Sequence, residues 1–180
     1  MLTRRFLKEK KGLAAIEFAL IGPVLATLLM GTIELCEALG AHQKVTMLAS
    51  SAADLVAQTT SVSASNMSDV FSAVSAIMYP YPSSNAQIII SSIVSDGNGN
   101  GTVAWSQAQN GTPLTVNAAI AIPTGLMDKT QCAKGACSVI LATITYPYTS
   151  PVSKMFIGTV NMTDYFYARP RKSATVSYTG

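Results

Sequence analysis

The chain has 180 residues, of which 49% are hydrophobic and only 12% are charged, and its formal net charge is +3. Residues 1–12 alone carry a net charge of +4, which leaves −1 for residues 13–180. A basic surface of the kind that binds nucleic acid is therefore not indicated, and we expect no nucleic-acid partner.

The N-terminal region consists of a basic leader followed by an apolar run. Residues 13–36 contain only two charged side chains, Glu17 and Glu34. A membrane span needs roughly 20 apolar residues, so this run predicts a transmembrane helix over 13–36. The basic leader, residues 1–12, places the N-terminus in the cytoplasm and the following domain outside it by the positive-inside rule.

Glu17 is the unusual residue of the predicted span. An ionisable group inside a bilayer is expensive and often functional. Glu17 lies four residues after Leu13, on one helical face, so its carboxylate could pair with a new amino group on Leu13 or on the same residue of a neighbouring helix. The alternative is that Glu17 lies near the cytoplasmic boundary and extends toward the headgroups.

Residues 12–25 read Gly-Leu-Ala-Ala-Ile-Glu-Phe-Ala-Leu-Ile-Gly-Pro-Val-Leu. This segment resembles the N-terminus of the TadE/TadF-like family, which comprises minor pilins (pseudopilins) of the tight-adherence (Tad/Flp) type IV pilus system. The resemblance implies cleavage by a prepilin peptidase between Gly12 and Leu13, and assembly roles for Glu17, Phe18 and Pro23. It also implies that the partners are other pilin or pseudopilin subunits and the pilus assembly machinery.

Pro23 removes a backbone donor inside the predicted span, and Gly22 precedes it. This pair predicts a kink in the helix. The kink could let the helix straighten or partly melt during assembly, although proline and glycine are also simply common in membrane helices.

The helix is predicted to continue beyond the membrane as an amphipathic extension over 37–60. Apolar or small residues recur there at a spacing of three and four, which marks one face of a helix: Val45, Leu48, Ala49, Ala52, Leu55, Val56 and Thr59. One helix is therefore predicted from Leu13 to about Gln58. The alternative is a break near Gly40, because glycine is a weak helix former.

Residues 61–180 are predicted to form an extracytoplasmic α+β domain, pilin-like, with an antiparallel sheet against the outer half of the long helix. A short helix is expected through Val70–Met78, capped by Asn66 or Ser68 and ended by Pro80. Asp96–Gly101 predicts a hairpin turn. Strands are predicted at Gln87–Val94, from this turn through Trp105, and at Leu114–Ile122, Ser138–Tyr146 and Ser173–Tyr178.

Cys132 and Cys137 lie close together in a segment that the topology places outside the cytoplasm. Disulfides persist there, so a bond between the two residues is expected. Metal binding is the alternative, but two thiols alone do not complete a zinc site. Cys36 is expected to be a packing residue at the outer end of the span.

Catalysis has little support in the sequence. The single His42 follows the predicted span, and nucleophile-elbow, phosphate-loop and paired-histidine motifs are absent. We therefore expect that the protein is not an enzyme and that it binds no cofactor and no metal. Arg169, Arg171 and Lys172 form a cationic cluster, which is interpreted either as a patch for anionic lipid or an acidic partner, or as a solvated turn.

The predicted function is that of a minor pilin or pseudopilin in a Tad pilus assembly or secretion apparatus, supporting pilus biogenesis and adhesion. The predicted location is the bacterial inner membrane, single-pass, with a periplasmic domain and with an extracellular pilus as a further destination. One alternative is an uncleaved, membrane-anchored structural protein. A third interpretation is a secreted adhesin or enzyme.

Overall fold

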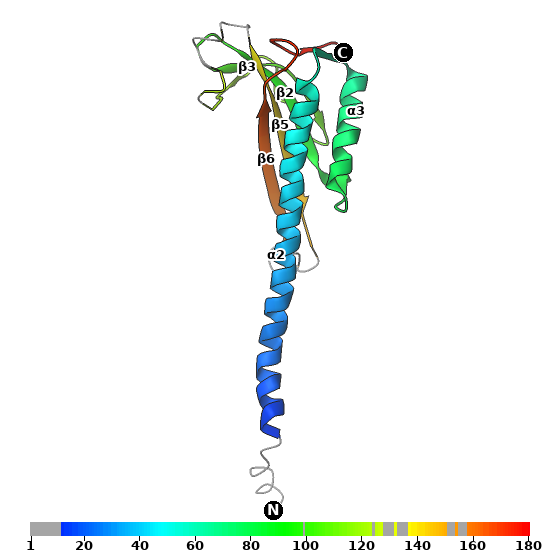
Figure 1. Cartoon of the computed structure of the whole chain (residues 1–180), viewed down its shortest axis with the longest axis vertical. Helices are drawn as coiled ribbons and strands as arrows, with labels where there is room; N and C mark the ends of the chain where they lie inside the picture. Colours follow the sequence, from blue (N-terminus) through cyan, green and yellow to red (C-terminus); the bar gives the residue numbers. More distant parts are fainter. Residues whose placement is uncertain are drawn as a thin grey trace, which may run out of the picture.

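The computed structural model describes residues 12–98, 100–123, 125–127, 132, 137–150, 154 and 158–180. Within these ranges the chain is a long helix that carries a small α+β domain on its C-terminal half (Figure 1). The fold class predicted from the sequence is confirmed. Residues 1–11 of the predicted leader lie outside the described residues.

The long helix, α2, runs from Leu13 to Ala57 without interruption. Its 45 residues extend over about 68 Å at 1.5 Å per residue. The predicted helix is thus confirmed, and the alternative of a break near Gly40 is wrong. Packing explains why, since Ala41 and Val45, directly after this glycine, are fully buried against the domain. The helix also continues through Pro23, and the predicted kink stays a prediction.

The main sheet has five strands in the order β4-β3-β2-β5-β6, and all its neighbouring strands are antiparallel. Its strands are β2 (Gln87–Ser95), β3 (Gly101–Gln109), β4 (Ala119–Ile120), β5 (Ser138–Tyr148) and β6 (Val160–Ala168). A separate two-stranded parallel sheet joins β1 (Ser61–Val62) to β7 (Ser177–Tyr178). The remaining elements are the helix α3 (Ala64–Ser75) and the 3₁₀ turns η2 (Ala76–Met78) and η3 (Ser83–Asn85).

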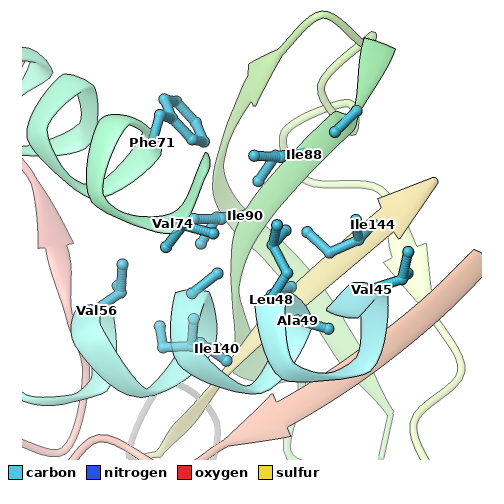
Figure 2. Packing of buried hydrophobic residues seen from close by; sticks show 14 of the residues in the cluster. Val45, Leu48, Ala49, Val56, Phe71, Val74, Ile88, Ile90, Ile140 and Ile144 are labelled. Atoms are coloured by element: carbon cyan, nitrogen blue, oxygen red, sulfur yellow. The ribbon is translucent and has the colours of Figure 1, made fainter. Parts of the chain in front are cut away.

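The main core lies between the C-terminal half of α2, the helix α3 and one face of the sheet. Figure 2 shows Leu48 and Ala49 of α2 beside Ile144 of β5, with Val74 of α3 beside Ile90 of β2. Small residues on the buried face of α2, such as Ala49 and Ala52, allow the helix to approach the sheet closely. The spacing of three and four that predicted the amphipathic extension therefore identifies most of the buried face of α2. It was wrong at Leu55, which is 39% exposed because Ala52, Ala53, Val56 and Ala57 face the core instead.

The hairpin turn predicted at Asp96–Gly101 connects β2 and β3. The Asp96 carboxylate accepts hydrogen bonds from the backbone N–H groups of Asn98 (2.7 Å) and Asn100 (3.0 Å). These bonds, with that of Asn98 the largest contribution, lower the pKa of Asp96. The side chain thus satisfies the turn's own backbone, as an Asx turn does.

The helix α3 begins earlier than the sequence predicted. Its N-cap is Ser63, whose hydroxyl accepts from the backbone N–H of Asn66, while the Asn66 side chain accepts from the N–H of Ser63. Neither Asn66 nor Ser68 is therefore the cap. Asn66 is instead the second member of a reciprocal capping box.

Two predicted strands are much shorter than expected, and two strands, β1 and β6, were missed. Only Ala119–Ile120 of the segment 114–122 is extended in a sheet, because Asn117 has a positive φ of 65° and turns the chain. Of the segment 173–178 only Ser177–Tyr178 forms a strand, and it pairs with β1 outside the main sheet. Of the two missed strands, β6 is an edge strand in which polar residues interrupt the apolar pattern. The other, β1, has only two residues, too few to show a strand pattern.

Candidate functional site in the first helix

The N-terminal half of α2 stands clear of the domain (Figure 1). One stretch of 18 residues has a mean hydropathy of 2.1 and is entirely unburied, so α2 is long and apolar enough to cross a membrane. Leaving a large apolar side chain in water costs about 1.5–3 kcal/mol relative to burying it. Lipid or other chains are therefore expected to cover the exposed residues: Leu13, Ile16, Phe18, Leu20, Ile21, Val24, Leu25, Leu28, Leu29, Met30, Ile33 and Leu35.

The peptide bond expected to be cleaved lies at the start of α2. Gly12 is the N-cap residue, with φ −85° and ψ −13°, and Leu13 is the first residue of the helix. A Cβ atom added at Gly12 would meet no atom within 4 Å. The Gly12–Leu13 bond therefore lies at the start of α2, and none of the described residues crowds Gly12.

Glu17 and Phe18 lie one turn inside the helix. Phe18 is 75% exposed, and its ring covers Gly22, with 3.7 Å between the nearest ring carbon and a Cβ built on that glycine. Within the described part of the chain, no salt bridge or hydrogen bond joins Glu17 to another side chain. Like Glu17 and Phe18, Pro23 is an exposed residue in the N-terminal half of α2. Any partner that these residues have must thus come from outside the domain.

Polar contacts between α2 and the domain were missed by sequence reasoning. Ser150 donates a hydrogen bond to the carboxylate of Glu34. The hydroxyl of Tyr81 donates to the backbone oxygen of Glu37 at 3.0 Å. Farther along the helix, Thr46 donates to the carboxylate of Asp164 on β6. The only sign of these contacts in the sequence was the carboxylate of Glu34 at the end of an apolar run. Its partner could not be predicted, because Ser150 is 116 residues away in sequence.

The C-terminal cations have partners inside the molecule. Arg171 forms a salt bridge with Asp54 near the end of α2. Arg169 donates to the backbone oxygen of Leu126 at 2.6 Å. Lys172 is exposed. The two arginines therefore contact other parts of the domain, while all three cations stay exposed. The interpretation as a patch for anionic lipid or an acidic partner, or as a solvated turn, stays a prediction.

The structure pairs Cys132 with Cys137 in a disulfide, with 5.5 Å between their Cα atoms. This pair belongs to a second, smaller core that includes Ile93 and Leu141. The backbone N–H of Ser95 donates to the carbonyl oxygen of Cys137 at 3.0 Å, so the disulfide is attached to the end of β2. Cys36 is a free, exposed thiol on α2.

The described residues offer little for metal binding or catalysis. Among them, no group of three or more His, Cys, Asp or Glu side chains is placed to hold a metal ion. His42 is exposed on α2. An open hollow of about 610 Å³ lies beside Trp105, Val176 and Tyr178, and its lining contains no acidic, basic or thiol side chain.

Comparison with known proteins gives one match. The family model described as TadE-like protein matches residues 12–54. No curated protein matches the chain, and no solved structure matches it. The matched segment begins at Gly12 and includes nearly all of α2. Residues 12–54 are thus a TadE-like segment, as the sequence resemblance predicted, and they indicate a Tad pilus-related protein with a candidate membrane anchor at its N-terminus.

Proposed function

We propose that this protein is a single-pass minor pilin or pseudopilin of a Tad-type pilus assembly or secretion apparatus. A prepilin peptidase cuts it between Gly12 and Leu13, and the helix over residues 13–36 anchors it in the bacterial inner membrane. The domain lies on the periplasmic side, and the mature subunit enters an extracellular pilus that supports adhesion. No enzymatic activity is part of the proposal.

The observation that carries the proposal is the exposed apolar half of α2, in which Glu17 has no partner among the described residues. Two environments cover such a surface without changing the fold of the domain. One is the lipid bilayer, and the other is a bundle of the same helices in a filament. A subunit that moves between the two needs a helix that stands free of its own domain, as α2 does (Figure 1).

In this proposal, Glu17 determines how neighbouring helices align in the filament. After cleavage the N-terminus of Leu13 carries a positive charge, and a neighbouring helix can bring its Glu17 carboxylate beside it. Two charges buried together in an apolar bundle offset much of each other's desolvation cost, whereas one alone does not. Correct register between neighbouring helices would therefore depend on this pair.

The test replaces Glu17 by glutamine, which keeps the size of the side chain and removes its charge. We expect Glu17→Gln to insert in the membrane normally but to be lost from isolated pili. Glu34→Gln is the matched control, because it removes the other charge of the span while the amide oxygen can still accept the hydrogen bond from Ser150. Recovery of Glu17→Gln in pili at the native level would contradict the assembly role.

Topology is tested separately by a periplasm-dependent reporter such as alkaline phosphatase fused after Gly180. An active reporter is expected if the domain lies outside the cytoplasm. An inactive reporter on a membrane-bound protein would place the domain on the other side and overturn the proposal.

A further inference from the structure

A group of polar and aromatic residues surrounds α2 where it enters the domain. We call Glu34, Glu37, Tyr81, Tyr148 and Ser150 the collar. Ser150 donates to the carboxylate of Glu34, and Tyr81 donates to the backbone oxygen of Glu37. The loop that contains Ser150 and the loop that contains Tyr81 therefore bind successive turns of α2. The rings of Tyr81 and Tyr148 meet edge to face, with 6.4 Å between their centroids and an interplanar angle of 71°.

The collar fixes the domain at one position along the helix. Tyr148 is only 5% exposed, and its pKa is raised by burial first and by the nearby carboxylates of Glu34 and Glu37 second. Gly40 makes room for the contact, since a Cβ there would lie 3.0 Å from the Tyr81 hydroxyl. The domain therefore cannot slide along α2 without breaking these contacts.

The position of the collar relative to a bilayer follows from the helix rise and rests on the proposed function. From Leu13 to Glu34 the helix rises about 32 Å, close to the roughly 30 Å of a hydrocarbon core. If Leu13 lies at the inner boundary, Glu34 lies at the outer one. Glu37 and Gly40 lie about 5 and 9 Å farther out, at the depth of the headgroups.

One exposed aromatic residue lies beside the collar at this depth. Tyr79 is 80% exposed and is two residues from Tyr81, directly after the 3₁₀ turn η2 that follows α3. In Figure 1 the lower end of α3 points along α2 toward the exposed half of the helix. Tyrosine is enriched at bilayer surfaces because its ring is apolar and its hydroxyl is polar.

We propose that the collar and Tyr79 seat the domain directly on phospholipid headgroups at the outer face of the bilayer. The ring of Tyr79 contacts the headgroup layer, and the collar prevents the domain from swinging on the helix. The membrane thus touches this protein at two places, the spanning helix and the lower end of the domain. Subunits held in this way present the same face to every neighbour before assembly.

The experiment measures how close the two ends of α3 lie to a membrane surface. The full chain is reconstituted in phosphatidylethanolamine–phosphatidylglycerol vesicles that contain a phosphatidylcholine with a nitroxide on its headgroup. A fluorophore is attached to a single free cysteine, either Ala76→Cys or Ala64→Cys, in a Cys36→Ser background that keeps the Cys132–Cys137 disulfide intact. Both alanines are exposed, and they lie about 18 Å apart along the helix.

We expect the fluorophore at residue 76 to be quenched several-fold more strongly than the one at residue 64. Tyr79→Ser and Tyr81→Phe, each combined with Ala76→Cys, should weaken the quenching, the first by removing the headgroup contact and the second by removing the hydrogen bond to Glu37. Equal quenching at residues 76 and 64 would overturn the seating.

A fluorophore on native Cys36 distinguishes this failure from failure of the anchor. If the helix spans the bilayer, the Cys36 fluorophore is quenched whatever the domain does. If Cys36 is quenched but both ends of α3 are quenched equally, the helix spans the bilayer and the domain does not rest on the headgroups. That result overturns the proposed headgroup contact alone. No quenching at Cys36 overturns the membrane anchor and the seating with it.

Discussion

Arg171 pairs with Asp54 near the C-terminal end of α2, and the backbone N–H of Arg171 donates to the carbonyl oxygen of Ala57 at 2.8 Å. The C-terminal segment is thereby attached to the end of the first helix. Because cations near a helix C-terminus also interact favourably with its dipole, the contact stabilises the end of α2 in two ways.

Removal of this pair should have a small, salt-dependent effect. The Arg171 and Asp54 side chains are 65% and 36% exposed, and exposed ion pairs contribute at most about 1 kcal/mol. We expect a double-mutant cycle of Asp54→Asn and Arg171→Gln, measured by urea unfolding in detergent, to give a coupling energy in this range that shrinks with added salt. Lys172→Gln is the control, and a larger effect from it would contradict the assignment.

The buried face of α2 should dominate the stability of the domain. Leu48 is fully buried in the main core, whereas the adjacent Met47 is 53% exposed. Leu48→Ala should lower the free energy of unfolding by about 2–5 kcal/mol, since it removes buried methyl groups and leaves a cavity. Met47→Ala should change it by less than about 0.5 kcal/mol. Similar losses for both variants in denaturant unfolding would mean that the helix does not pack as described.

The cap of α3 can be tested by a pair of serines. Ser63→Ala removes the hydroxyl that accepts from the N–H of Asn66 and should cost about 1 kcal/mol. Ser68→Ala removes an exposed hydroxyl inside the same helix and should have almost no effect. A greater loss of thermal stability for Ser68→Ala would show that the helix begins later than Ser63.

Stability should fall in alkaline solution. Burial raises the pKa of Tyr146, Tyr148 and Tyr167 above the ordinary value near 10. The unfolded chain then loses these protons before the folded chain does, so the folded state loses stability as pH rises above about 10. Thermal unfolding measured from pH 8 upward checks this, and Tyr148→Phe should reduce the loss. A melting temperature that is unchanged through this window would contradict the pKa shifts.

Local pattern predicted much of this fold. The repeat that includes Val45 and Leu48 identified the buried face of α2 because packing follows helical periodicity. β-branched residues identified β2 and β5 for a similar reason. Edge strand β6 was missed since an edge exposes polar residues such as Asn161 and Thr163, which weaken the alternating pattern.

Distant contacts were not predictable in the same way. The sequence resemblance singled out Gly12, Glu17 and Pro23, which lie within 12 residues of one another. The pairs Glu34–Ser150 and Asp54–Arg171 join positions more than 100 residues apart. Only the folded topology brings them together, because no local rule relates a turn after β5 to the first helix.

The most direct test of the account is the N-terminal sequence and intact mass of the native protein extracted from membranes. We expect a chain that begins at Leu13, and a Gly12→Val variant that remains uncut. Open space around Gly12 means that this variant should fold normally. A native chain that still begins at Met1 would contradict prepilin processing and leave an uncleaved anchor, and one that begins after the whole predicted span, residues 13–36, would make the protein secreted.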